Sequence, residues 1–288
     1  MTELREAHAV PVQLPETRRV LMVAPEHYSI LYEINPWMSR EVAVSSTAAK
    51  RQWEALYETV KEKLGARVEL AEPEPGLPDM VFTANAGLVV GEVAVLSNFR
   101  HPERQGEREP FRRWFAAHGF RIAELPLELN FEGEGDALFA GDTLFAGYFW
   151  RSDVRAHAAL AELLSIRVLS LQLVDPYYYH LDTCLCVLDA ETVAYVPSAF
   201  DPYARQVLDA NVRNRIEIVP EEARRFAANA LVLGRRVALN TGCPQFESDL
   251  RAHGFEPYAT PLDEFLKAGG SAKCLTLHLD REGEQLGK

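Results

Sequence analysis

Residues 84–96 read Ala-Asn-Ala-Gly-Leu-Val-Val-Gly-Glu-Val-Ala-Val-Leu. A small or polar pair, an apolar run, a Gly-Glu turn and a second apolar run predict a strand, a tight turn and another strand. The same pattern recurs four more times along the chain. The second residues of the five pairs are Asn85, Asp136, Asp182, Asn229 and Cys274. They stand 51, 46, 47 and 45 residues apart, which indicates one module repeated five times.

Between the hairpins lie helix-like segments, each followed by a short strand-like run, at residues 46–64, 109–118, 153–164 and 202–211. The module is therefore strand, strand, helix, strand, which is an α/β architecture. The last copy lacks a second long strand, and residues 19–23 are predicted to supply it. That pairing joins the two ends of the chain and removes exposed sheet edges. We predict a closed ring of five ββαβ units, with an open α/β sheet as the alternative, and a single domain over residues 1–288.

The composition and net charge of the chain indicate which kinds of binding partner and which location to expect. The chain has 288 residues, is 48% hydrophobic and carries a formal charge of −12, which argues against nucleic acid or an anionic membrane as its partner. Its apolar runs are shorter than the ~20 residues that span a bilayer, and its polar start lacks a signal-peptide core. We therefore expect a cytoplasmic protein. Its four cysteines are expected to be free thiols, with Cys184 and Cys186 buried and inert.

The five repeat-related positions at the start of each hairpin are all polar, although each opens an apolar strand. In a ring, equivalent positions face one central axis. A nucleophile, carboxylates and amides at five such positions favour a pocket over five unrelated turns. His180 and Glu132 stand close to them in the sequence.

Four segments resemble, in order, the signature segments of arginine deiminases, dimethylarginine dimethylaminohydrolases and amidinotransferases, which form the guanidine-modifying (pentein) superfamily. They are residues 79–85 (DMVFTAN), 131–136 (FEGEGD), 180–183 (HLDT) and 269–274 (GGSAKC). Residues 34–38 (INPWM) and 98–104 (NFRHPER) resemble the arginine dihydrolase branch. The resemblance covers nearly the whole chain. It implies a five-bladed α/β propeller with pseudo-fivefold symmetry, a small-molecule substrate, and neither a cofactor nor a metal.

The resemblance also implies roles for individual residues. Cys274 is expected to attack the guanidinium carbon of arginine and form a thiouronium intermediate, since a thiolate is a good nucleophile. His180 is expected to protonate the leaving amine and then deprotonate the hydrolytic water. Glu132 and Asp182 are implied to hold guanidinium nitrogens, because carboxylates make bidentate charge-assisted bonds to that planar cation.

The substrate carboxylate is implied to bind Arg104 and Arg151. The acid at the second signature segment has two candidates, because this chain reads Glu-Gly-Glu-Gly-Asp where most relatives have Glu-Gly-Gly-Asp. We prefer Glu132 to Glu134, because it follows Phe131 as the acid follows an apolar residue in the dihydrolase pattern. His278 lies on the strand face of Cys274 by period-two counting and is expected to be structural.

The chain departs from the deiminase pattern at Asn85, where deiminases have an aspartate. An amide donates as well as accepts hydrogen bonds, so Asn85, assisted by Asn35, is expected to hold the ureido oxygen of citrulline. Arginine would then be hydrolysed twice, to ornithine, carbon dioxide and two ammonia. The alternatives are a deiminase that stops at citrulline, a methylarginine hydrolase, an amidinotransferase, and a non-enzymatic binding protein on the same scaffold. The oligomeric state stays open.

Overall fold

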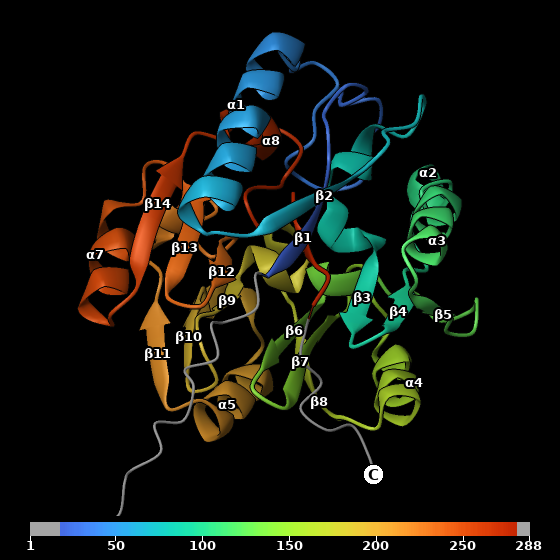
Figure 1. Ribbon diagram of the computed structural model, residues 1–288. Helices are drawn as coiled ribbons and strands as arrows, with labels where there is room; N and C mark the ends of the chain where they lie inside the picture. The colour runs from blue at the N-terminus through green and yellow to red at the C-terminus, as the bar shows by residue number, and fades with distance from the viewer. Residues whose placement is uncertain (1–17, 281–288) are drawn as a thin grey trace, which may run out of the picture.

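The computed structural model describes residues 18–280, and these form a ring of five small sheets around one axis (Figure 1). Each sheet has an inner, a middle and an outer strand. In that order they are β15 (Leu277–His278), β1 (Arg19–Val23) and β2 (Arg67–Ala71); β3 (Gly87–Val90), β4 (Val93–Leu96) and β5 (Arg121–Ala123); β6 (Ala137–Ala140), β7 (Thr143–Tyr148) and β8 (Arg167–Gln172); β9 (Leu185–Val187), β10 (Thr192–Tyr195) and β11 (Asn214–Glu217); and β12 (Leu231–Leu233), β13 (Arg236–Asn240) and β14 (Glu256–Thr260).

Inner and middle strands pair antiparallel, and middle and outer strands pair parallel in all five sheets. A parallel pair needs a crossover connection, and a helix supplies it in each blade. These helices are α1 (Ser46–Glu58), α3 (Arg108–Ala117), α4 (Val154–Leu164), α5 (Pro202–Asn211) and α7 (Pro244–Ala252). Three shorter helices, α2 (Pro102–Gln105), α6 (Pro220–Ala223) and α8 (Asp263–Leu266), lie in connecting segments. The predicted strand-strand-helix-strand module is confirmed.

Helix α1 illustrates how local sequence places the outer layer. Ser45 caps its first turn, because its side chain accepts a hydrogen bond from the backbone N–H of Ala48. Ala49, Trp53 and Leu56 recur at helical spacing and are buried, so one face of the helix packs on the ring. In Figure 1 the blade helices lie around the outside of the five sheets.

The ring is closed by the two ends of the described chain, as predicted. Strand β1 pairs antiparallel with β15, with Val20 opposite His278 and Leu21 opposite Leu277. The first blade is thus built from both ends of the sequence, and Figure 1 shows blue β1 beside the red final segment.

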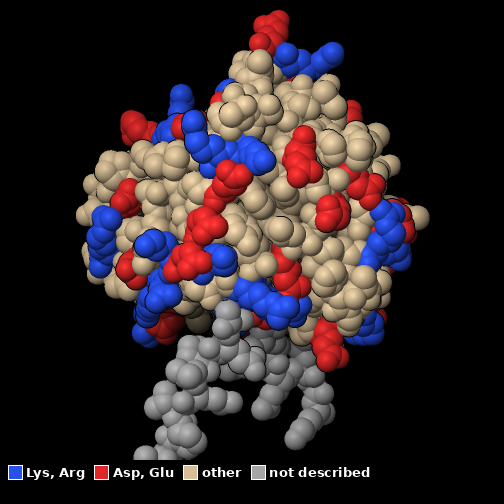
Figure 2. Space-filling view, turned by 45° about the horizontal axis from the view of Figure 1, so that its top comes forward, with Lys and Arg blue, Asp and Glu red and all other residues tan. Residues whose placement is uncertain are grey.

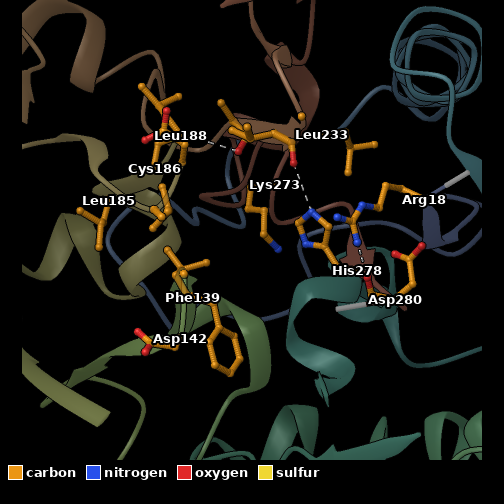
Figure 3. Close-up of a pocket in the computed structure, with 18 of the residues that line it drawn as sticks. Arg18, Phe139, Asp142, Leu185, Cys186, Leu188, Leu233, Lys273, His278 and Asp280 are labelled. Atoms are coloured by element: carbon orange, nitrogen blue, oxygen red, sulfur yellow. Dashed lines mark hydrogen bonds between the residues drawn. The ribbon is translucent and has the colours of Figure 1, made fainter. Parts of the chain in front are cut away.

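The inner strands of all five blades enclose a cavity of about 710 Å³ on the axis (Figure 3). Its wall includes the hairpin tips, at the far ends of the inner strands from the five predicted polar positions.

On the outer surface, Figure 2 shows acidic and basic side chains interspersed over the face that it draws. Among the described residues, no helix is both long enough and apolar enough to cross a membrane.

Candidate active site

The five repeat-related positions lie where the chain enters each inner strand, and they link neighbouring blades. Asn85 Nδ2 donates to the carbonyl of Glu132, and Asn229 Nδ2 donates to that of Asp182. Asp136 accepts from the backbone N–H of Leu181. All five positions are buried. The sequence analysis favoured one pocket over five unrelated turns. That prediction was incomplete, because these residues also build the turns that hold the blades together.

The side chains of Asp136 and Asn229 make hydrogen bonds to other groups of the protein. Asp136 accepts from Ser152 Oγ at 2.6 Å in addition to Leu181. The Asn229 oxygen accepts from the backbone N–H groups of Ser271 and Cys274, at 3.0 and 3.1 Å. Asn229 thus fixes the turn that carries the cysteine.

Cys274 lies between an amide and a carboxylate. Its Sγ accepts from Asn229 Nδ2 at 3.0 Å and donates to Asp182 Oδ2 at 3.3 Å. The second carboxylate oxygen of Asp182, Oδ1, is buried and has no hydrogen-bond partner within residues 18–280. A buried carboxylate oxygen without a donor costs free energy, and it marks a place where a ligand N–H would bind.

Burial controls the protonation of this pair. It raises the pKa of the Cys274 thiol well above its usual value, and the nearby Asp182 carboxylate raises it further. Burial also raises the pKa of Asp182 to about 7, although Lys273 opposes the shift. Without a cation bound, the cysteine is therefore a neutral thiol at neutral pH.

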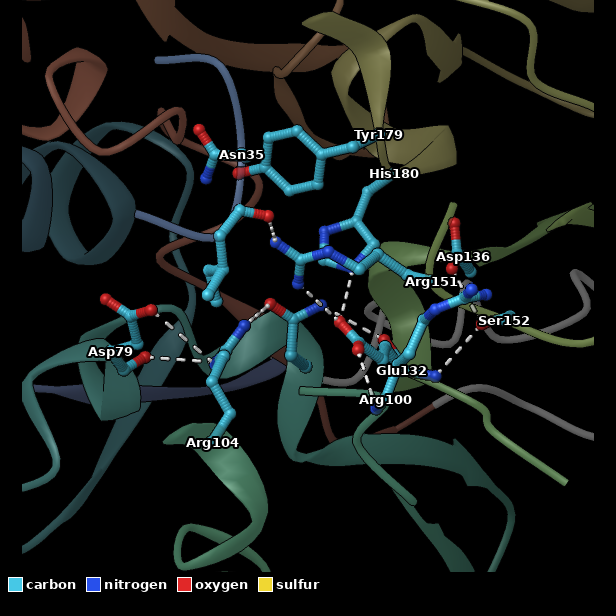
Figure 4. Close-up of polar contacts among 12 residues, drawn as sticks. Asn35, Asp79, Arg100, Arg104, Glu132, Asp136, Arg151, Ser152, Tyr179 and His180 are labelled. Carbon is cyan, nitrogen blue, oxygen red and sulfur yellow. Dashed lines mark hydrogen bonds and ion pairs between the residues drawn. The ribbon is translucent and has the colours of Figure 1, made fainter. Parts of the chain in front are cut away.

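Glu132 contacts both a histidine and an arginine (Figure 4). Its Oε2 accepts from His180 Nε2 at 2.7 Å and from Arg151 Nη1 at 2.9 Å, and its Oε1 accepts from the backbone N–H of Arg100 at 3.1 Å. The Arg151 guanidinium also stacks on the ring of Tyr179, with a distance of 4.6 Å from Cζ to the ring centroid.

The carboxylate fixes the tautomer of the histidine. Burial lowers the pKa of His180 to about 4, although Glu132 opposes that shift, so the imidazole is neutral at pH 7. A neutral ring that donates from Nε2 keeps its lone pair on Nδ1, where it can take up a proton. Burial alone would raise the pKa of Glu132, but Arg151 and His180 hold it below the usual range, so Glu132 is ionised.

Asn85 is oriented by an arginine. Arg104 Nη1 donates to Asn85 Oδ1 at 2.8 Å, while Glu107 accepts two hydrogen bonds from Arg104, at 2.8 and 2.7 Å. The amide oxygen therefore faces a cation and the amide nitrogen is the donor. Nδ2 uses one N–H on the Glu132 carbonyl, which leaves the second for another acceptor.

Asn35 ties down the segment that precedes α1. Its oxygen accepts from the backbone N–H of Trp37 at 2.9 Å, and its nitrogen donates to the carbonyl of Ala268 at 3.1 Å. Arg151 Nη2 donates to the neighbouring Ile34 carbonyl at 3.2 Å. Figure 4 draws Asn35 beside Tyr179, above the Glu132 and His180 pair. The structure therefore brings this predicted residue to the rim of the same cluster.

The two candidate acids face different partners. Glu134 accepts from Lys273 Nζ at 2.9 Å and contacts His278 Nδ1 at 3.0 Å, whereas Glu132 contacts His180. His278 lies in strand β15, but the cysteine lies in the turn before that strand, so counting strand faces between them was wrong.

Two residues of the cluster, Tyr179 and Glu107, were missing from the prediction, and Asn229 was predicted to face the pocket but was given no role there. Tyr179 stacks on Arg151 and donates from its hydroxyl to the Gly269 carbonyl at 2.7 Å. Glu107 holds Arg104, and Asn229 contacts the thiol. The position of Tyr179 directly before His180 was a usable signal, and so was the three-residue spacing from Arg104 to Glu107 on a helical segment.

Among residues 18–280 no group of three or more His, Cys, Asp or Glu side chains is placed to hold a metal ion. All four cysteines are free and buried. The cluster brings together a thiol, a neutral imidazole and carboxylates.

Comparison with known proteins gives a family. Residues 33–281 match the family model described as N,N dimethylarginine dimethylhydrolase, eukaryotic. The chain is 44% identical to the N(G),N(G)-dimethylarginine dimethylaminohydrolase of Mycobacterium tuberculosis, over 92% of this chain and 87% of that protein. It is 47% identical to the bifunctional arginine dihydrolase/ornithine cyclodeaminase ArgZ of Synechocystis, over 91% of this chain. The match spans only 37% of the length of ArgZ.

A solved structure gives the same relationship. The N-terminal domain of ArgZ, described as an arginine dihydrolase of cyanobacteria, was solved with one cysteine replaced by serine and with substrate bound. It superposes on this chain with a TM-score of 0.89 at 45% identity, covering 92% of this chain and 99% of that domain.

Proposed function

Because this chain belongs to the dimethylarginine dimethylaminohydrolase family of the guanidine-modifying (pentein) enzymes, we propose that it hydrolyses arginine through Cys274. The products are ornithine, carbon dioxide and two ammonia, formed with two molecules of water. We further propose that residues 1–288 act as one catalytic domain. The free cysteines and the net negative charge favour a cytoplasmic location.

The observation that carries the proposal is the state of Asp182. It is fully buried, it shares the Cys274 proton through Oδ2, and its Oδ1 has no donor. A planar guanidinium supplies the missing N–H and a compensating positive charge. Such a cation also favours the ionised thiol, so binding of the substrate and activation of the nucleophile occur together.

In the first hydrolysis the thiolate forms a bond to the guanidinium carbon, and one C–N bond breaks to release ammonia. When the substrate cation binds, the proton of the Cys274 thiol passes to Nδ1 of neutral His180, because Glu132 holds the Nε2–H. His180 then delivers this proton to the leaving nitrogen. Neutral His180 then takes a proton from water, which attacks the thiouronium carbon. The C–S bond breaks, and citrulline and the thiol are formed.

The second hydrolysis depends on Asn85. Citrulline carries an oxygen in place of one nitrogen, and a carboxylate beside it would repel that oxygen. Arg104 fixes the amide of Asn85 with its nitrogen as the donor, so the remaining N–H can bind the ureido oxygen. Cys274 then attacks the ureido carbon, and its C–NH2 bond breaks to release the second ammonia. Water displaces the sulfur, and the carbamate left on the δ-nitrogen loses carbon dioxide to give ornithine.

We propose that Arg151 and Arg104 bind the substrate carboxylate. Both arginines are buried and bonded to protein acceptors, Glu132 and Glu107 respectively. A carboxylate ligand therefore competes with an internal carboxylate for each arginine. Tyr179 keeps the Arg151 guanidinium in place by stacking on its face.

A second candidate is supported by the 44% identity to the dimethylarginine dimethylaminohydrolase of Mycobacterium tuberculosis. That reaction uses the same Cys274 and His180 chemistry and releases dimethylamine and citrulline. A deiminase would also stop at citrulline, and an amidinotransferase would need an acceptor amine. The 47% identity to ArgZ, together with the donor orientation of Asn85, favours the dihydrolase.

The test is a time course with arginine that quantifies citrulline, ornithine and ammonia. The dihydrolase predicts two ammonia for each ornithine and hydrolysis of added citrulline. Parallel reactions with dimethylarginine test the second candidate by its release of dimethylamine. Cys274→Ala is the matched control, because alanine offers no nucleophile. Turnover by Cys274→Ala, or loss of wild-type activity in EDTA, would overturn the mechanism.

A further inference from the structure

The axial cavity lies apart from the catalytic cluster. The cluster surrounds the entry points of the inner strands, and the cavity reaches the hairpin tips at their other ends. Its volume of about 710 Å³ falls within the range of roughly 300–1,000 Å³ typical of small-molecule sites. The wall is mainly apolar and draws side chains from several blades, including Val90, Leu138, Leu185 and Val232.

One buried cation lies at the inner end of this apolar wall. Lys273 is 5% exposed, and its Nζ donates to Glu134 Oε2 at 2.9 Å and to the Thr276 carbonyl at 3.2 Å. An ammonium group has three N–H donors, so one remains beyond these two bonds. Figure 3 shows the Lys273 amine pointing into the middle of the cavity.

A histidine next to Lys273 adds a second donor group. His278 Nδ1 lies 3.0 Å from Glu134 Oε1, and its Nε2 lies 3.4 Å from the Val232 carbonyl (Figure 3). Lys273 and His278 thus contact the same carboxylate, Glu134, and Lys273 is the residue that keeps an N–H for a ligand in the cavity.

The outer end of the cavity is different. Arg18 donates to the Asp280 carbonyl at 2.9 Å, and Asp189 is paired with Arg235 at 3.1 Å. Asp142 lies at the tip of the β6–β7 hairpin, away from Lys273 in Figure 3. An anionic group is therefore best placed at the inner end, where the surrounding apolar wall strengthens its attraction to the ammonium.

We propose that the axial cavity is a binding site for a small organic anion, a carboxylate with an apolar body, whose head group binds Lys273 and whose body packs on the inner strands. The inference does not depend on the reaction at Cys274, because the cavity wall is built from the inner strands and hairpin tips, and Lys273, although next to Cys274 in the chain, points its amine into the cavity. It adds a second ligand site to the chain.

Isothermal titration calorimetry tests the proposal with three probes that share one apolar body: hexanoate, hexanol and hexylammonium. We expect one hexanoate per chain, bound at least tenfold more tightly than hexanol, and no binding of hexylammonium. Lys273→Met should weaken hexanoate binding at least tenfold. Arg151→Met is the control, because it removes a cation of the catalytic cluster and should leave hexanoate binding unchanged.

Two further variants keep the test decisive. Val232→Phe fills the cavity while retaining Lys273, and should abolish binding. The double variant Lys273→Met, Glu134→Gln removes both charges of the buried pair. It replaces Lys273→Met in the titration if circular dichroism shows that the single variant is unfolded. Equal binding of the three probes, absence of hexanoate binding, or binding lost in Arg151→Met but retained in Lys273→Met would each overturn the proposal.

Discussion

In the proposed reaction Asp182 and Asn85 have different tasks, and the fold leaves each of them one kind of contact to make. Asp182 has a buried oxygen without a donor beside the thiol, which suits a cation. Asn85 has its oxygen bound by Arg104, which leaves its nitrogen to donate. In this proposal Asp182 binds the guanidinium of arginine, and Asn85 accommodates the neutral ureido group of citrulline.

Replacing Asn85 with Asp tests that division. A carboxylate keeps the size of the side chain and the contact to Arg104, but it cannot donate to the ureido oxygen. We expect Asn85→Asp to accumulate citrulline, with citrulline hydrolysis slowed about tenfold to a hundredfold, because a mismatched buried polar group costs on the order of 1–3 kcal/mol. Product analysis over time is the measurement. Ornithine formation at the wild-type rate would contradict the role of Asn85.

The protonation of Asp182 makes a prediction about stability and pH. Its pKa of about 7 in the folded protein lies above the value near 4 of an unfolded chain, so the folded state holds the proton more tightly. The stability that this group contributes is complete below about pH 4 and is lost as the pH rises through 7. Asp182→Asn cannot titrate. The wild-type free energy of unfolding minus that of Asp182→Asn should therefore fall between pH 4 and 7, by on the order of 1 kcal/mol per pH unit.

Urea unfolding of both proteins at half-unit pH steps measures that difference. The comparison cancels groups common to both, including His180, whose lowered pKa acts in the opposite direction. A difference that stays constant with pH would show that Asp182 titrates normally.

At the scale of elements, the turn that carries both candidate acids decides which one meets the histidine. The 3₁₀ turn Gly133–Gly135 separates Glu132 from Asp136, and Gly133 has a φ of +61°, which side chains other than glycine rarely adopt. This left-handed residue directs the two glutamates to different sides of the turn. Glu132 reaches His180, and Glu134 reaches Lys273.

The two glycines of this turn are predicted to respond differently to alanine. At Gly133 a Cβ would lie 2.7 Å from the Gly87 carbonyl oxygen and 2.8 Å from that of Ala84, in addition to the strain of its φ. At Gly135 a Cβ would overlap the side chain of Asn85. We expect Gly133→Ala to lose more than about 2 kcal/mol of stability, and Gly135→Ala to lose activity with a smaller loss of stability.

Chemical denaturation and steady-state kinetics distinguish the two effects. The matched control is Gly234→Ala, at a hairpin tip where φ is also positive but no atom lies within 4 Å of an added Cβ. If Gly133→Ala were no less stable than Gly234→Ala, the close backbone approach would not matter.

At the scale of the whole molecule, ring closure places the two ends of the described chain side by side. The backbone N–H of Arg19 donates to Asp280 Oδ2 at 2.8 Å, and that of Leu279 donates to the Arg19 carbonyl at 2.9 Å. The same closure puts Cys274, near one end of the sequence, against residues of three other blades. Adjacent ends and exposed hairpin tips are the features that allow circular permutation.

A permuted chain in which Lys288 is joined to Met1 and new ends are opened between Gly91 and Glu92 should therefore fold and keep its activity. Those two residues form the exposed tip between β3 and β4. Opening the chain between Gly133 and Glu134 should abolish activity, because that turn holds the catalytic cluster. Circular dichroism and the ornithine assay are the measurements. An inactive, unfolded Gly91 permutant would contradict the adjacency of the ends.

The sequence alone determined the ring. Short-range patterns of apolar, glycine and polar residues specify the hairpins and helices, and five copies at nearly equal spacing favour a closed ring of equivalent units over an open sheet. The same repeat identified the axial positions, so Asn85, Asp182 and Cys274 could be singled out before the structure was known. His180, two residues before Asp182, and Glu132, four residues before Asp136, followed from the signature segments.

Only the tertiary structure decided how those residues meet. The pairing of Glu132 with His180 and the contact of Asp182 with Cys274 join residues of different blades, and Arg104 reaches Asn85 from a later segment of the same blade. The axial cavity depends on inner strands from all five blades. Residue patterns report local backbone geometry, whereas contacts across the axis are set by the packing of blades far apart in the chain. Burial by that packing also sets the protonation of Cys274, Asp182 and His180, which no local pattern records.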